Sequence, residues 1–87
     1  MTREQIQQKL IEIAAERAGV PASEVTPATN FVNDLEFDSL DVTEFVMEVE
    51  DEFKLSLPDE EVEKLATVGL VIDFVVEQLK LARASSS

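Results

Sequence analysis

The spacing of apolar residues predicts a first helix over residues 3–18. Thr2 followed by Gln5 has the pattern of a capping box at its start, and Gly19 supplies a stop at its end. Apolar residues recur three or four positions apart between these signals, as expected for one face of a helix. That face consists of Ile6, Leu10, Ile13 and Ala14.

A long connection is predicted between this helix and the next, as far as about residue 37. Pro21, Pro27 and the polar residues between them interrupt any regular pattern. A loop of this length in a compact domain usually carries function. Four apolar residues are expected to hold it against the helices, namely Val25, Phe31, Val32 and Leu35.

A second helix is predicted from Leu40 to Phe53. Asp38 is a good N-cap, and Asp41 adds a carboxylate to the first turn, where it favours the helix dipole. At 100° per residue a core stripe forms on one side of the helix, while Leu40 and Met47 fall on the opposite side among carboxylates. The stripe consists of Val42, Phe45, Val46, Val49 and Phe53.

The rest of the chain predicts a short helix and a long one. Leu57-Pro58-Asp59 starts a helix that we expect to run to about Leu65. Thr67 can cap the last helix, which is favoured over a strand despite its β-branched residues because its apolar stripe keeps helical spacing. Its stripe consists of Val68, Val71, Ile72, Val75 and Leu79.

Together these elements predict an all-α fold, a four-helix bundle with a long loop between the first and second helices and a short third helix. Residues 1–82 would form one domain, and residues 83–87 a flexible C-terminal tail that begins to fray at Ala82. Eighty-seven residues leave no room for a second core.

The composition narrows the possible functions. The 19 acidic and 7 basic residues give a net charge of -12, so we expect no nucleic-acid partner and instead proteins with basic patches. The chain has no apolar signal segment and no run long enough to span a membrane, which predicts a cytoplasmic protein, or one in an organelle if a transit peptide has been removed. Without cysteine or histidine, we expect no disulfide and no metal site.

Ser39 is the most informative position. It lies at a predicted helix start and at the end of a long loop, in a chain that lacks the usual activators of a serine nucleophile. A hydroxyl displayed without a base is typical of a modification target, although a plain capped helix start is the competing interpretation. The exposed pair Leu40 and Met47 indicates a docking strip.

Carboxylates dominate the second half of the chain. Thirteen acidic residues lie between Asp34 and Glu63 with Lys54 as the only base, which favours a surface for Arg- or Lys-rich partners. The spacing does not match a calcium-binding loop, and a small bundle offers no deep cleft for a hydrolase that uses paired carboxylates.

Several runs of residues, taken in order over residues 3–80, closely resemble the acyl carrier protein family. They are Phe31-Val32-Asn33-Asp34-Leu35, Asp38-Ser39-Leu40-Asp41, Glu44-Phe45-Val46-Met47, Glu52-Phe53 and Leu57-Pro58-Asp59-Glu60-Glu61. The resemblance implies that a phosphopantetheinyl transferase uses coenzyme A to attach a 4'-phosphopantetheine arm to Ser39, flanked by Asp38 and Leu40. The thiol of this arm would carry acyl groups as thioesters, so the chain itself would not be an enzyme.

The resemblance also implies two surfaces. The second helix would dock acyl transferases, ketosynthases and other acyl-processing enzymes through apolar and acidic residues, namely Leu40, Met47, Asp38, Asp41, Glu44, Glu50 and Asp51. The acyl chain would enter a cavity lined by Phe31, Val49, Leu57, Val62, Leu65 and Ile72. A free-standing monomer is expected from the length of the chain.

The chain departs from the family pattern in two places. Glu36-Phe37 stands where many members have a small pair such as Gly-Ala, so an aromatic ring would lie beside the arm. Val42-Thr43 stands where Thr-Val is commonest. The departures leave open a specialised carrier of amino-acyl, D-alanyl or secondary-metabolite cargo. An unmodified helical interaction domain is the alternative from another class, whereas the missing histidine argues against an esterase.

The high net charge leads to a first prediction. Self-repulsion of the folded chain should be screened by ions, so added NaCl or Mg²⁺ should raise the melting temperature near pH 7. Circular dichroism melts at low and high salt measure the effect. Equal melting temperatures would show that self-repulsion does not limit stability.

Overall fold

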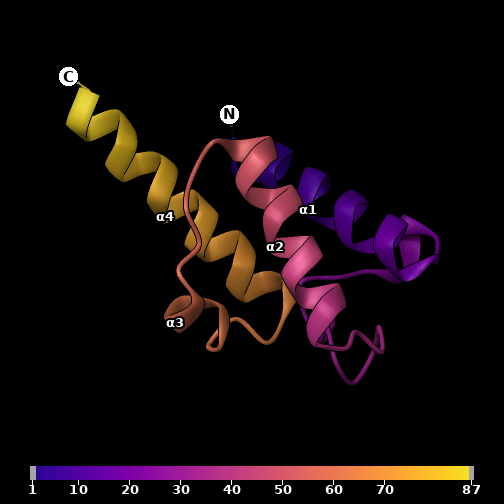
Figure 1. The fold of residues 1–87 in the computed structure, drawn as a ribbon. Coiled ribbons are helices and arrows are strands. Elements are labelled where there is room, and N and C mark those ends of the chain that lie inside the picture. The colour runs from indigo at the N-terminus through magenta and orange to yellow at the C-terminus, as the bar shows by residue number, and fades with distance from the viewer. Residues whose placement is uncertain (1, 87) are drawn as a thin grey trace.

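The predicted all-α architecture is confirmed. The computed structural model describes the backbone of residues 2–86 and the side chains of residues 2–81. A short 3₁₀-helix, η1, lies in the loop between α1 and α2 (Figure 1). The elements are α1 (Arg3–Ala18), η1 (Ala22–Glu24), α2 (Ser39–Phe53), α3 (Asp59–Val62) and α4 (Val68–Ser86).

The first helix has the predicted bounds because both of its ends are capped by its own sequence. The Thr2 hydroxyl accepts a hydrogen bond from the Gln5 N–H at 3.2 Å, and the Gln5 side chain accepts one from the Thr2 N–H at 2.8 Å. At the other end Gly19 adopts φ 72°, a left-handed conformation that glycine tolerates best. Both signals were readable in the sequence.

The core lies where α1 packs against α2 and α4. Lys9 contacts Glu52 while Arg17 contacts Glu44, so α1 and α2 run antiparallel. Leu10, Val49 and Ile72 are among the side chains that are completely buried between the helices. The last turns of α4, yellow in Figure 1, extend beyond the other helices.

The long loop is attached to the start of α4 by backbone hydrogen bonds. Phe31 N–H donates to the carbonyl of Ala66 at 3.1 Å, and Gly69 N–H donates to the carbonyl of Pro27 at 2.7 Å. The approach at Gly69 is so close that a Cβ there would lie 2.8 Å from the Pro27 oxygen. The loop is therefore a fixed part of the fold.

The apolar residues of this loop do not all point inward. Val25 and Phe31 are buried and Leu35 is half-buried, as predicted, but Val32 is 60% exposed. The prediction for Val32 was wrong because the Asn30 side chain accepts hydrogen bonds from two successive N–H groups, those of residues 32 and 33. The resulting turn directs Phe31 into the core and Val32 away from it.

Two predicted boundaries differ from the structure. The third helix ends at Val62 and not near Leu65, because the chain then tightens into turns in which Lys64 N–H and Leu65 N–H bond three residues back. The last helix continues to Ser86, although a frayed tail was predicted over residues 82–87. The helix-forming sequence Ala82-Arg83-Ala84 accounts for the extension. Residue 87 lies outside the described residues, and the flexibility of the tail stays a prediction.

Glu36 adopts φ 57°, in the left-handed region that costs a non-glycine residue about 1 kcal/mol. We predict that Glu36→Gly raises stability by about 0.5 kcal/mol, because the strain removed slightly exceeds the added chain entropy. Glu36→Val should lower stability by more than about 1 kcal/mol.

Glu63 is the matched control for this pair of variants because it is also exposed but has φ -59°. Glu63→Gly should lower the stability of the fold, because it adds chain entropy to the unfolded state without removing any strain. Urea unfolding of the three variants gives the comparison, and an equal loss of stability in Glu36→Gly and Glu63→Gly would contradict the assignment of strain.

Candidate functional site

Ser39 is the first residue of α2, and its neighbours hold the start of that helix in place. The Asp38 carboxylate accepts a hydrogen bond from the Asp41 N–H at 2.8 Å, and the Asp41 carboxylate accepts one from the Asp38 N–H at 3.2 Å. This reciprocal cap ends the loop at a defined residue. The Ser39 side chain itself is exposed. The hydroxyl is therefore displayed on a rigid helix start.

The Ser39 hydroxyl is not paired with a base in the part of the chain that the structure describes. Among the described side chains, none accepts a hydrogen bond from Ser39, and the neighbouring Thr43 hydroxyl donates to the Ser39 backbone carbonyl at 2.9 Å. The Thr43 hydroxyl is thus used to reinforce the first turn. The site thus displays a hydroxyl that is not paired with a base in the described part of the chain.

An open groove of about 780 Å³ adjoins Ser39. It lies between the first turn of α2, the end of the long loop and the α3 region. Phe37, Val42 and Leu65 contribute to its apolar walls, and Asp59 and Glu63 to its polar rim. A group attached at Ser39 would have this groove beside it.

Behind the groove lies a small internal cavity of about 20 Å³. Four of the six predicted cavity residues line it, namely Phe31, Leu57, Val62 and Leu65. Phe31, Val42, Val62 and Leu65 also line the groove, so these four side chains separate the cavity from the surface.

The other two predicted cavity residues are elsewhere. Val49 and Ile72 are fully buried in the packed core and do not line the cavity. Val42 and Val46, one turn apart on α2, line it instead, together with Phe45 and Val71. The stripe on α2 was predicted correctly, but the sequence did not indicate which part of it faces α3.

Phe37 belongs to a cluster of three aromatic rings. Its ring centroid lies 5.7 Å from that of Phe31 and 6.1 Å from that of Phe45, and the Phe31 and Phe45 centroids are 4.9 Å apart. All three side chains are at least 95% buried. Phe37 therefore joins the core next to Ser39 and also borders the groove.

The predicted docking strip is exposed on α2. Leu40 and Met47 are 63% and 61% exposed, and Asp51 is exposed beside them. Asp51 forms no ion pair with any described side chain. Glu50, by contrast, accepts a hydrogen bond from the Leu57 N–H at 2.8 Å and holds the segment after α2.

Two of the other predicted docking acids, Asp41 and Glu44, have an internal partner that the sequence did not reveal. Arg17, in the last turn of α1, contacts Glu44 at 2.6 Å, Glu48 at 3.2 Å and Asp41 at 3.7 Å. The hydrogen bond to Glu48 is the main reason that the pKa of the Arg17 guanidinium is raised. Only the antiparallel packing of α1 on α2 brings these residues together, so no local pattern could have indicated the contact.

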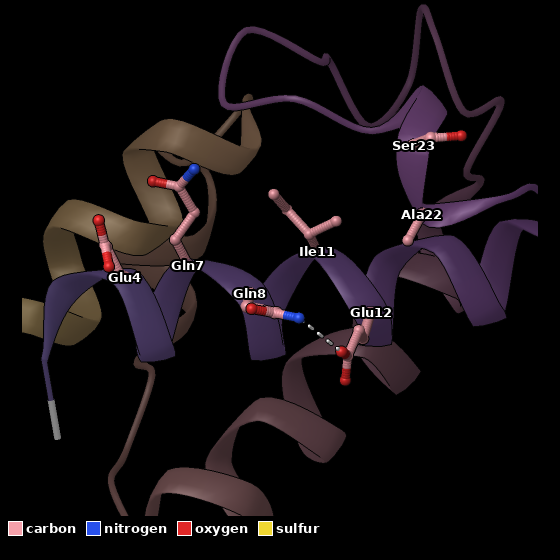
Figure 2. A pocket seen from close by; sticks show the side chains of 7 residues that line it. All are labelled: Glu4, Gln7, Gln8, Ile11, Glu12, Ala22 and Ser23. Carbon is pink, nitrogen blue, oxygen red and sulfur yellow. Dashed lines mark hydrogen bonds between the residues drawn. The ribbon is translucent and has the colours of Figure 1, made fainter.

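A second surface groove lies on α1 and η1, away from these residues (Figure 2). Glu4, Gln7, Ile11 and Ser23 are among its lining residues, and a long hydrogen bond of 3.5 Å joins Gln8 to Glu12 across one side. It contains none of the predicted site residues. We therefore place the functional site at the start of α2.

Comparison with known proteins shows the family of the chain. A family model described as a phosphopantetheine attachment site matches residues 8–75. An acyl carrier protein of Rubrobacter xylanophilus is 54% identical over 77 residues, covering 88% of this chain and 95% of the relative. An acyl carrier protein of Chlorobium phaeobacteroides is 41% identical over 78 residues, which cover 90% of this chain and 100% of the relative.

A solved structure extends the likeness to three dimensions. The acyl carrier protein of Enterococcus faecalis superposes with a TM-score of 0.77 at 43% identity, covering 88% of this chain and 98% of that one. The chain belongs to the phosphopantetheine-binding acyl carrier protein family. It is a carrier that uses covalent 4'-phosphopantetheine, and a role in fatty-acid biosynthesis fits its relatives.

The relatives are named as carrier proteins. They do not favour the alternative of a specialised carrier or an unmodified interaction domain. None of the described helices is both long enough and apolar enough to span a membrane.

Proposed function

We propose that Ser39 is the residue that carries the 4'-phosphopantetheine arm. The observation that supports this most directly is an exposed hydroxyl on a rigid, capped helix start that donates no hydrogen bond to a described side chain. A phosphopantetheinyl transferase would supply the base. The serine oxygen would then form a bond to the phosphorus of the arm, and the bond from that phosphorus to the nucleotide part of coenzyme A would break.

The capped start of α2 suits this reaction for two reasons. Asp38 and Asp41 satisfy each other's N–H groups, so the backbone on either side of Ser39 needs no rearrangement to present the hydroxyl. The neighbouring carboxylates would also attract a basic transferase. Asp38 and Leu40 thus flank the attachment residue and form part of the recognised surface.

We further propose that the acyl chain of the loaded carrier lies in the groove and reaches the cavity behind it. The groove adjoins Ser39, and it shares the lining residues Phe31, Val42, Val62 and Leu65 with the cavity. The cavity as it stands has space for about one water molecule. Entry of a chain would therefore move the wall residues Val42, Val62 and Leu65.

The exposed side of α2 would dock the enzymes that load and process the acyl group. Leu40 and Met47 offer adaptable apolar contacts, and Glu44 and Asp51 offer charges to basic patches of acyl transferases and ketosynthases. The monomeric state and the cytoplasmic location are part of the same proposal and rest on the sequence.

The attachment residue is tested by mass spectrometry. Incubation with coenzyme A, Mg²⁺ and a phosphopantetheinyl transferase should add the mass of one phosphopantetheinyl group, and Ser39→Ala should abolish the addition. Ser56→Ala, at another exposed serine, should be modified like the unaltered chain. Full modification of Ser39→Ala would refute the assignment.

The place of the acyl chain is tested by substituting the aromatic ring that borders the groove. Phe37→Leu removes buried volume and should lower stability by about 1–2 kcal/mol. An octanoyl group on the arm should then raise the melting temperature more in Phe37→Leu than in the unaltered chain, because it fills the vacated space.

Phe53→Leu serves as the control because Phe53 is equally buried in α2 but borders neither the groove nor the cavity. Attachment of the octanoyl group should raise the melting temperature of Phe53→Leu no more than it raises that of the unaltered chain. The same gain in both variants would place the acyl chain outside this groove.

A further inference from the structure

Arg17 forms a bridge between α1 and the exposed side of α2. One guanidinium nitrogen, Nη1, lies 2.6 Å from a Glu44 oxygen and 3.7 Å from an Asp41 oxygen, and the other, Nη2, lies 3.2 Å from a Glu48 oxygen. The Arg17 side chain is only 21% exposed, while the three carboxylates are 37–49% exposed. A single cation of the chain thus serves three carboxylates that solvent can still reach.

The position of Arg17 is imposed by its charged contacts. Its Nε–H is buried and has no hydrogen-bond partner, which is unfavourable for a guanidinium. The side chain nevertheless stays at the surface of α2, where the carboxylates attract it. The location in the last turn of α1 is also favourable, because the dipole of that helix favours a positive charge there.

We propose that Arg17 is a specificity-determining residue, an internal competitor that occupies the carboxylates which a partner's arginine or lysine would otherwise contact. The inference rests on the proposed docking function of α2. Glu44 and Asp41 were predicted as docking acids, and both lie within reach of Arg17. A partner must therefore bring enough positive charge to displace this guanidinium.

The proposal also defines the kind of partner that this surface fits. Ion pairs between partly exposed groups are weak enough to exchange, so Arg17 raises the threshold for binding without blocking it. Asp51 lies outside the bridge, and the apolar pair Leu40 and Met47 remains exposed. A protein with several clustered Arg or Lys side chains around an apolar contact would bind, whereas one with a single basic residue would be disfavoured.

The test measures binding of a phosphopantetheinyl transferase in a Ser39→Ala background, where no transfer interferes. Arg17→Gln should lower Kd roughly threefold to tenfold at low salt, and the difference should shrink at high salt. Lys9→Gln is the matched control, because it removes one charge and one ion pair, with Glu52 at 2.6 Å, from the same two helices. It should change Kd less than about twofold.

A second variant keeps the test decisive if Arg17→Gln does not fold, as judged by its melting temperature. Arg17→Lys retains the charge but has one ammonium in place of a forked guanidinium, so it should hold the three carboxylates less well and give an intermediate Kd. Equal or weaker binding by the folded Arg17 variants, relative to the Lys9 control, would overturn the inference.

Transfer to Ser39 in the native background separates this inference from the proposed function. If the unaltered chain accepts no phosphopantetheinyl group, the attachment proposal fails. If every variant is modified while Kd for Arg17→Gln matches that of Lys9→Gln, the attachment proposal stands and the role of Arg17 is refuted.

Discussion

The packing of Phe31, Phe37 and Phe45 is the contact on which the geometry of the site depends. The first two rings come from the long loop and the third from α2, and all are almost completely buried. Their contact fixes where the loop ends and therefore where α2 begins. Ser39 follows Phe37 by two residues, so its exposed position on the helix start is a direct result of aromatic burial.

The same packing explains how the pair Glu36-Phe37 is accommodated just before the start of α2. A glycine would adopt the conformation of Glu36, with φ 57°, at little cost, whereas glutamate is strained there. Burial of the Phe37 ring more than offsets that strain, because an aromatic side chain gains about 1.5–3 kcal/mol on leaving water. The two residues are best understood together, since the unusual turn at Glu36 directs Phe37 into the core.

The sequence predicted those parts of the structure that depend on local signals. The capping residues and apolar spacing placed α1 and α2, and the exposed serine and the Leu40–Met47 strip followed from the same helical geometry. The sequence was not sufficient where distant segments decide the outcome. Val49, predicted to line a cavity, lies in the packed core and does not line the small cavity, and the contacts of Arg17 were not predicted because they need two antiparallel helices.

The ion pairs change the meaning of the net charge of -12. Lys9 and Arg17 lie on α1 and pair with acids of α2, whereas Arg3, also on α1, pairs with Asp73 of α4, so two cations lie against one side of α2. The carboxylates on that side are partly neutralised within the molecule, while Asp51 is not. The surface that a partner meets is therefore graded in charge and not uniformly acidic. Because charge complementarity orients proteins as they associate, this gradient would favour one orientation of a basic partner along α2.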